Sequence, residues 1–363
     1  MMYSSELKAI KKSNRFRKRE VCNTNLIDFA SNDYLGLSEV KSLLLKTCKT
    51  MQSYDTHAPK SSQLVNGYHQ IHKNFEELLC RTNGFSSALV VGSGFLANLA
   101  LIESLPRKKD LLILDEEYHA SGLFASKLLD ATVWKFQHNN MDELEKLLNK
   151  GDFKRVIVAV EGIYSMSGDL LDEKIFELCD KYKFLLIVDE AHSVGVVGKK
   201  LLGVFDLYDI KPNKYHIKMG TLGKALGSYG AYILCSNHIS EYLQNRAKPL
   251  IYATAPSLFD IELAKENFIY MCDNREFFTK EIKKRKAIIK RYFGYDMDGL
   301  IFSYKLQSSQ DVLKYREKLA STGFSVGAIR PPTVEVPILR IIPRVSVEEK
   351  KFEEFCKYLV ELK

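Results

Sequence analysis

The segment Ile187-Val188-Asp189-Glu190-Ala191-His192 decides the fold. An apolar run, 184–188, leads directly into Asp189, as expected for a buried strand that ends in a charged residue. Ligands of open α/β sheets bind beyond the carboxyl ends of the strands, so Asp189 is expected at a ligand site. His192 follows three residues later. Similar strings occur in helicases and elsewhere, and Asp189 taken alone could equally be a loop-capping aspartate.

Apolar segments alternate with helical patterns on both sides of this strand. The helical patterns cover 94–104, 119–129, 141–149 and 172–182. Near-continuous apolar strands that alternate with helices indicate a mostly parallel sheet covered on both faces. The sequence therefore predicts an α/β fold whose large domain holds a seven-stranded sheet. Its expected strands are 87–91, 110–114, 133–137, 155–161, 184–189, 215–219 and 230–235.

The two ends of the chain differ from this centre. Early helices are expected at 7–13, 39–51 and 69–83, with a short strand at 26–30, and a long helical region at about 257–293. Antiparallel strands at 300–306, 324–329 and 338–342 alternate with helices at 309–321 and 346–361, which predicts a smaller α+β domain. The expected division is an N-terminal helix and segment beside the small domain (1–38), the large domain (39–250), and a linking helix with the small domain (251–363).

Composition narrows the class of protein. The chain has 363 residues, 46% of them hydrophobic, and a net charge of +8. No apolar run approaches the roughly 18 residues of a membrane span, and residues 1–20 lack the apolar stretch of a secretion signal. The seven cysteines form no CxxC pair, which indicates no zinc site and fits a reducing cytoplasm. No nucleic-acid module accompanies the positive charge, so no nucleic-acid partner is expected.

Lys224 is the candidate nucleophile. It lies in Thr221-Leu222-Gly223-Lys224-Ala225-Leu226-Gly227, directly after an extended segment. Burial among small residues would favour the neutral amine, which can attack a carbonyl carbon. Most lysines are solvated, so Lys224 is a weak signal alone, but its place 35 residues after Asp189 strengthens it. No GxxxxGK[ST] loop is present, which disfavours an ATPase.

Two further segments could bind a flat, phosphorylated ligand. Gly92-Ser93-Gly94-Phe95 joins a strand to a helix, where free backbone N–H groups bind phosphate. His119 begins the next helix, and its imidazole could stack on a ring. A simple turn and a helix-capping histidine are the alternatives.

Together these parts resemble the fold-type I pyridoxal-phosphate enzymes, specifically the α-oxoamine synthases. The resemblance extends over most of the chain, and eight strings carry it in order and spacing. They are SNDYLGL (31–37), LVNGYH (64–69), GSGFLAN (92–98), EGIYSMSGD (161–169), VDEAHS (188–193), GTLGKALG (220–227), IYAT (251–254) and RPPTV (330–334).

The resemblance implies roles around the ring of pyridoxal 5'-phosphate. Lys224 would form the Schiff base, and Asp189 would pair with the pyridine nitrogen. His192 would bind the phenolic oxygen, which Ser165 would also approach, and His119 would stack on the ring. Lys224, Asp189, His192 and His119 are thus the expected catalytic residues.

The resemblance also implies a phosphate site shared between two subunits. The backbone of Gly94 and Phe95 and the hydroxyl of Thr221 would hold the phosphate. Thr254 would reach it across a dimer interface. A homodimer with its active site at the interface is therefore expected.

Asn32 and Arg340 would contact the amino-acid carboxylate, for which a guanidinium is well suited.

Three positions depart from the family pattern. Gln63 stands where an arginine is usual, Ser167 where an aspartate is usual, and Ile338 where the first arginine of Arg-Leu-Arg is usual. These departures bear on recognition of the acyl chain more than on the cofactor.

The implied reaction is the decarboxylative condensation of L-alanine with a pimeloyl thioester, carried by CoA or by an acyl carrier protein, as in biotin biosynthesis. Glycine C-acetyltransferase, which uses glycine and acetyl-CoA, has the same motifs and is the alternative. Serine palmitoyltransferase and 5-aminolevulinate synthase fit less well, because the chain is compact. A non-catalytic protein that has kept the fold is a further alternative, but it would need neither Lys224 nor Asp189.

Overall fold

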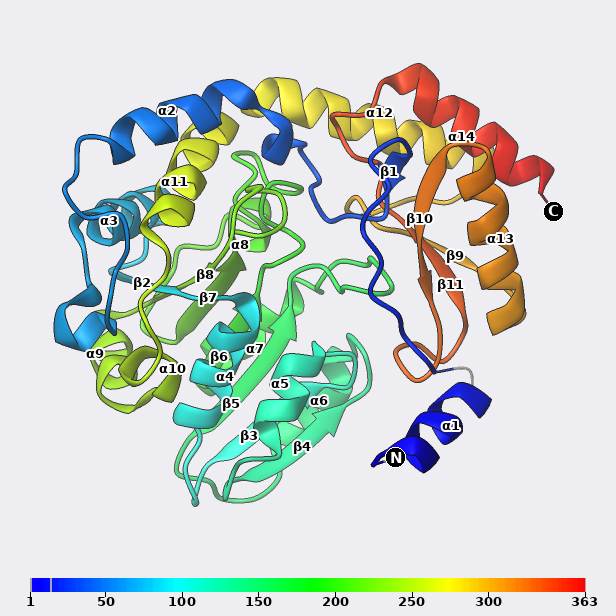
Figure 1. The fold of residues 1–363 in the computed structure, drawn as a ribbon. Coiled ribbons are helices and arrows are strands. Elements are labelled where there is room, and N and C mark those ends of the chain that lie inside the picture. The colour runs from blue at the N-terminus through cyan, green and yellow to red at the C-terminus, as the bar shows by residue number, and fades with distance from the viewer. Residues whose placement is uncertain (1, 14, 363) are drawn as a thin grey trace.

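The computed structural model describes residues 2–13 and 15–362. Figure 1 shows a large α/β part, a smaller part built from both ends of the chain, and long helices that run between them. The large sheet has the strand order β2-β8-β7-β6-β5-β3-β4. Its strands are β2 (Ser87–Val91), β3 (Leu111–Asp115), β4 (Thr132–Phe136), β5 (Val156–Glu161), β6 (Leu185–Asp189), β7 (His216–Thr221) and β8 (Ala231–Cys235).

Six of these strands run in one direction: β3 to β7 pair in parallel, and β2 has the same direction because β8 is antiparallel to both of its neighbours, β2 and β7. The expectation of a mostly parallel, seven-stranded sheet is confirmed. The central strands β3, β5 and β6 are almost entirely buried and apolar, because helices cover both faces of the sheet, whereas the edge strand β4 exposes Thr132 and Lys135. One face packs against α4 (Gly94–Ser104), α5 (Ala120–Ser126), α9 (Asn237–Arg246) and α10 (Lys248–Ile251). The other packs against α3 (Gln70–Asn83), α6 (Met141–Leu148), α7 (Lys174–Tyr182), α8 (Val204–Leu207) and α11 (Leu258–Asp273).

Side-chain alternation decides which polar residues share a face. Ile157 and Ala159 of β5 and Ile187 of β6 belong to the apolar cluster under α4 and α5. Side chains two residues apart in a strand point the same way. Glu161 and Asp189, the last residues of these strands, therefore point toward the α4 and α5 side.

The small part contains a four-stranded sheet in the order β1-β10-β11-β9. Its strands are β1 (Ile27–Phe29), β9 (Phe302–Lys305), β10 (Phe324–Ile329) and β11 (Ile338–Ile341). The three C-terminal strands are antiparallel, as expected, and β1 adds in parallel to β10. The sheet shares its core with α12 (Arg275–Phe293), α13 (Ser309–Ser321) and α14 (Glu349–Glu361). The small sheet thus combines a strand from the N-terminal segment, β1, with three strands from the C-terminal part of the chain.

The expected helical region 257–293 is present, and it consists of two helices, α11 and α12. Asn274 ends α11: its backbone N–H and its side-chain amide both donate to Tyr270 O, at 3.0 and 2.9 Å. Asparagine competes with the helix by such local bonds, and α12 begins at the next residue.

Several short elements had no counterpart among the expected ones. They are α8, α9, α10, the 3-10 helix η1 (Leu37–Glu39) and the π-helical turn η2 (Gln63–Gly67). At the N-terminus, α1 (Ser4–Lys12) buries none of its residues. The helix α2 (Lys41–Met51) packs against α11. No helix within the described residues is long and apolar enough to cross a membrane.

Candidate active site

Lys224 lies in the turn that follows β7, and its amine is 2.6 Å from His192 Nε2. Burial lowers the pKa of Lys224 to about 8, although the carboxyl groups of Asp189 and Glu161 oppose this shift. The other ring nitrogen of His192, Nδ1, is 2.5 Å from the Tyr34 hydroxyl. The Lys224 amine therefore lies next to the His192 imidazole, and Tyr34 orients that ring. These three residues form the Lys224 cluster.

The His192 ring is neutral. Burial, and then the positive charges of Lys224 and Arg340, hold its pKa well below the usual range. An ammonium group can only donate hydrogen bonds, so Nε2 accepts from Lys224 when the amine is protonated. Nδ1 then carries the proton and donates to the Tyr34 oxygen.

Asp189 ends β6 and is 4% exposed. Its Oδ2 accepts from Asn98 Nδ2 at 2.8 Å, and its Oδ1 accepts from the Ala191 amide at 3.0 Å. Asn98 is itself fixed, because its Oδ1 accepts from the Tyr118 hydroxyl at 2.6 Å. The carboxyl group is thus rigid and held by neutral donors, which suits pairing with a cationic ring N–H.

His119 caps the start of α5. Its Nδ1 is 2.7 Å from Ser121 Oγ and accepts from the Ser121 amide at 3.3 Å. Burial lowers the pKa of His119. Ser121 Oγ also accepts from Asn98 Nδ2 at 3.0 Å, so the imidazole is connected to the Asp189 network. His119 is therefore a helix-capping histidine, and these bonds also fix the plane of its imidazole ring.

The start of α4 has the geometry of a phosphate site. Ser93 Oγ accepts from the Leu96 amide at 3.2 Å, and the first two helical amides are those of Gly94 and Phe95. A side chain at Gly94 would lie 3.8 Å from the Cβ and Oγ1 atoms of Thr221. Helix start and threonine thus face each other, and helix N-termini attract phosphate.

Arg340 of β11 reaches the cluster from the small sheet. Its Nε donates to Ser165 O at 2.7 Å, and its Nη1 donates to Asn32 Oδ1 at 2.8 Å. Its Nη2 is buried, and among the described residues it has no hydrogen-bond partner. A buried N–H group without a partner is costly, so the guanidinium is prepared for an anionic ligand.

Thr254 is not brought to this cluster. It is exposed on the segment after α10, and within the described residues no hydrogen bond connects it to the site. Ile338 is buried two residues before Arg340, so its side chain shares the strand face of Arg340. Because Ile338 replaces the usual arginine, the face of β11 that carries Arg340 has one positive charge fewer than the family pattern.

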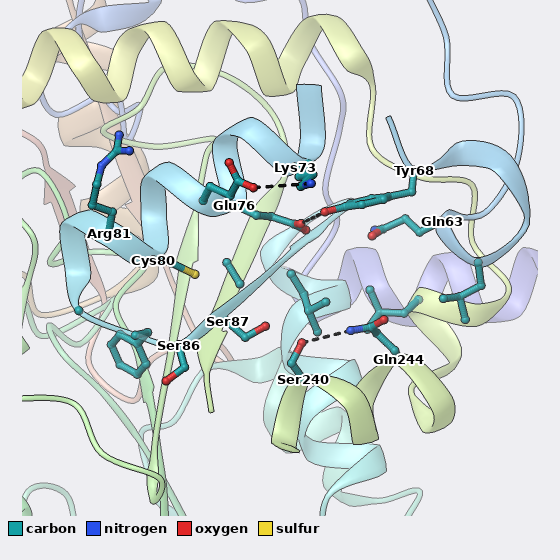
Figure 2. Close-up of a pocket in the computed structure, with 17 residues that line it drawn as sticks. Gln63, Tyr68, Lys73, Glu76, Cys80, Arg81, Ser86, Ser87, Ser240 and Gln244 are labelled. Atoms are coloured by element: carbon teal, nitrogen blue, oxygen red, sulfur yellow. Dashed lines mark hydrogen bonds and ion pairs between the residues drawn. The ribbon is translucent and has the colours of Figure 1, made fainter. Parts of the chain in front are cut away.

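Gln63 lies elsewhere, in a cavity of about 710 Å³ along the edge strand β2. Its side-chain amide donates to Val90 O at 2.7 Å. Figure 2 shows Gln63, Tyr68 and Glu76 among the residues that line this cavity. The Tyr68 hydroxyl donates to Glu76 Oε2 at 2.5 Å. None of the residues that line the cavity belongs to the Lys224 cluster.

A second charged cluster is structural. His138 bonds Asp115 Oδ1 at 3.0 Å and Asp169 Oδ2 at 2.6 Å. Burial alone would lower the pKa of His138, but these two bonds raise it to about 10. Glu117, His138 and Asp169 bring ligand atoms within 4.8 Å of one another. A metal ligand must be deprotonated, so the protonated ring acts as the cation of the cluster.

A family model of aminotransferase class I and II matches residues 24–359. The chain belongs to this aminotransferase family. Within the family it is 43% identical over 342 residues to 8-amino-7-oxononanoate synthase of Helicobacter pylori (strain ATCC 700392 / 26695), covering 94% of this chain and 92% of that protein. It is 33% identical to a putative 8-amino-7-oxononanoate synthase of Aquifex aeolicus (strain VF5), covering 98% of this chain and 96% of that protein.

Solved structures share the fold. An 8-amino-7-oxononanoate synthase from Francisella tularensis superimposes with a TM-score of 0.76 and 26% identity, covering 94% of this chain and 98% of that one. A serine palmitoyltransferase from S. paucimobilis with bound PLP and myriocin has a TM-score of 0.89 at 19% identity, covering 99% and 96%. The resemblance to the α-oxoamine synthases is confirmed.

Sequence reasoning did not assign five residues that complete the site. Asn98, Tyr34 and Glu161 lie inside the strings that carried the resemblance, so their position was a usable signal. Tyr118 and Ser121 lie outside those strings. Their bonds to Asn98 join residues 20 and 23 positions apart, which no local pattern records.

Proposed function

We propose that the chain uses pyridoxal 5'-phosphate to condense L-alanine with a pimeloyl thioester, giving 8-amino-7-oxononanoate, CO2 and a free thiol. The observation that carries the chemistry is a buried amine, Lys224, held beside a neutral imidazole and close to a rigid carboxylate. The relatives named above support the choice of substrates.

The residues present fit the cofactor. When bound, it supplies an electron-withdrawing ring that stabilises negative charge at the substrate α-carbon. Asp189 would hold the ring nitrogen, and His192 would face the phenolic oxygen. His119 would lie against the ring, with Ser165 near the ring oxygen. The α4 amides of Gly94 and Phe95, together with the Thr221 hydroxyl, would hold the phosphate.

Lys224 would attach the cofactor covalently, and its free amine would then exchange protons with the substrate. A pKa of about 8 leaves a useful fraction of the amine neutral near pH 7, which both roles require. His192 accepts a hydrogen bond from the amine and keeps it directed into the site.

The amino-acid carboxylate would bind Arg340 and Asn32. The unpartnered Nη2 of Arg340 supplies a donor for it, and the bonds to Ser165 O and Asn32 Oδ1 fix the plane of the guanidinium. A guanidinium held in this way suits two parallel bonds to a carboxylate.

A second copy of the chain would complete the site. Large apolar side chains are exposed on η2, at the start of α4 and near Thr254, among them Val65 (77%), Phe95 (48%) and Tyr252 (79%). Exposed apolar groups of this size indicate an interface. In the proposed homodimer Thr254 reaches the phosphate of the other subunit. The seven free cysteines support a cytoplasmic location.

The dimer is tested by mixing two inactive variants, Lys224→Ala and Thr254→Ala. If the two residues serve one site from different subunits, mixed dimers regain one intact site and part of the activity. A monomeric protein, or mixtures without recovery, would contradict the shared site.

The reaction itself is tested with a matrix of substrates. Glycine, L-alanine and L-serine are each combined with acetyl or pimeloyl thioesters, on CoA and on acyl carrier protein, and products are identified by mass. We expect product from L-alanine with the pimeloyl thioester and none with Lys224→Ala. Turnover of glycine with acetyl-CoA instead would assign the glycine C-acetyltransferase reaction.

A further inference from the structure

Glu161 is a buried carboxyl group without an assigned role. It ends β5, and its Cα pairs in register with that of Asp189 on the neighbouring parallel strand. Both side chains point to the α4 and α5 face of the sheet, and adjacent strands lie about 4.8 Å apart. Glu161 is 2% exposed. Two carboxyl groups therefore lie side by side beneath the Lys224 cluster.

Glu161 is connected to the substrate arginine through one residue. Its Oε2 accepts from the Ser165 amide at 3.1 Å, and the Ser165 carbonyl accepts from Arg340 Nε at 2.7 Å. The Glu161 carboxyl group thus holds the amide of Ser165, and the carbonyl of the same residue holds the Arg340 guanidinium.

The charge around Glu161 favours its neutral form. Burial, and next the adjacent carboxylate of Asp189, raise its pKa well above the usual range, and Asp115 of β3 acts in the same direction. Lys224 and the bond from the Ser165 amide oppose this rise in pKa, but the Lys224 amine is bonded to His192 and not to Glu161. Within the described residues Glu161 Oε1 has no hydrogen-bond partner, so no ion pair offsets a charge on Glu161.

We propose that Glu161 is a positioning residue: as a neutral acid it fixes the Ser165 peptide, and through that peptide it sets the Arg340 guanidinium for the amino-acid carboxylate. This inference rests on the proposed function for the identity of the ligand. It adds that Asp189 is the only anion of the pair. A second negative charge beside it would compete for the proton of the ring nitrogen.

Two variants separate this role from a general effect on folding. Glu161→Gln keeps a neutral acceptor for the Ser165 amide, whereas Glu161→Leu removes the acceptor at similar volume. Glu241→Gln on the exposed side of α9 is the matched control. The dissociation constant of L-alanine is measured from the change in cofactor absorbance, and cofactor content is measured for each protein.

We expect Glu161→Gln to bind L-alanine as the parent protein does, with the same pH dependence from about pH 6 to about pH 9. Glu161→Leu should weaken binding about tenfold, as for the loss of one well-placed hydrogen bond, with full cofactor content. In the Arg340→Leu background, Glu161→Leu should have no further effect, because both changes act on one contact.

Unchanged alanine binding by Glu161→Leu would overturn the inference. So would a shifted pH profile for Glu161→Gln, since only an ionised Glu161 would produce it; this arm decides the matter even if Glu161→Leu fails to fold. The measurement needs no thioester, and it is repeated with glycine, whose carboxylate would meet the same arginine. A wrong amino acid or acyl donor in the proposed function would therefore be recognised separately.

Discussion

The ionisation of Lys224 gives a quantitative prediction. Burial lowers its pKa from 10.5 to about 8. At pH 7 about one amine in ten is then neutral, against about one in 3,000 for a solvated lysine, a gain of about 300-fold. Pyridoxal phosphate should therefore attach to the cofactor-free protein at a rate that rises with pH and levels off above about 8.

The assay is stopped-flow absorbance on cofactor-free protein, with N-α-acetyl-lysine in the same buffers as the reference for ionisation of the aldehyde. Two variants should move the midpoint in opposite directions. Asp189→Asn removes a neighbour that raises the pKa of Lys224, so the midpoint should fall; Arg340→Leu removes one that lowers it, so the midpoint should rise. A midpoint near 10.5 in the parent protein would refute the claim that burial controls this amine.

Three further predictions concern its neighbours. Asp189→Asn should retain the cofactor but slow exchange of the alanine α-hydrogen with solvent about 100-fold or more, measured by NMR, because the ring nitrogen loses its anion; unchanged exchange would remove Asp189 from this role. Tyr34→Phe frees His192 Nδ1 and should slow the same exchange about tenfold, with cofactor content as the control. His138→Asn should lower the melting temperature most below pH 6.5, and the difference from the parent should fade as pH rises through about 10, because a raised histidine pKa stabilises the fold only while the ring is protonated. A difference that grows with pH would contradict the imidazolium.

The central sheet could be predicted because its signal is local. Most of its strands are near-continuous apolar runs that alternate with helical patterns, and the strand ending at Asp189 was predicted to within one residue. The break at Asn274 could not be found from apolar periodicity, which continues across it. The helix α9 had a usable signal in Ser236, whose hydroxyl accepts from the Ile239 amide at 3.4 Å.

The residues of the site also fall into a predictable group and an unpredictable group. Asp189, His192 and Lys224 lie at predictable strand ends, so their approach follows from a parallel sheet. The bond between Asn98 and Asp189 joins residues 91 positions apart, and that between Tyr34 and His192 spans 158. Such pairs depend on how helices and the N-terminal segment pack over the sheet, which no local pattern records.

Lys218 offers the sharpest comparison for the central claim that Lys224 carries the cofactor. Both lysines lie on or just after β7 and both have a pKa lowered by burial. The Lys218 amine, however, donates to Asn83 Oδ1 at 2.9 Å, and its side chain lies on the sheet face opposite Asp189.

The decisive measurement is borohydride reduction of the cofactor-loaded protein, followed by peptide mass spectrometry. The structure predicts the pyridoxyl mass on Lys224 alone, and its loss in Lys224→Ala. Modification of Lys218, or a protein that takes up no cofactor, would contradict the assignment of the active site.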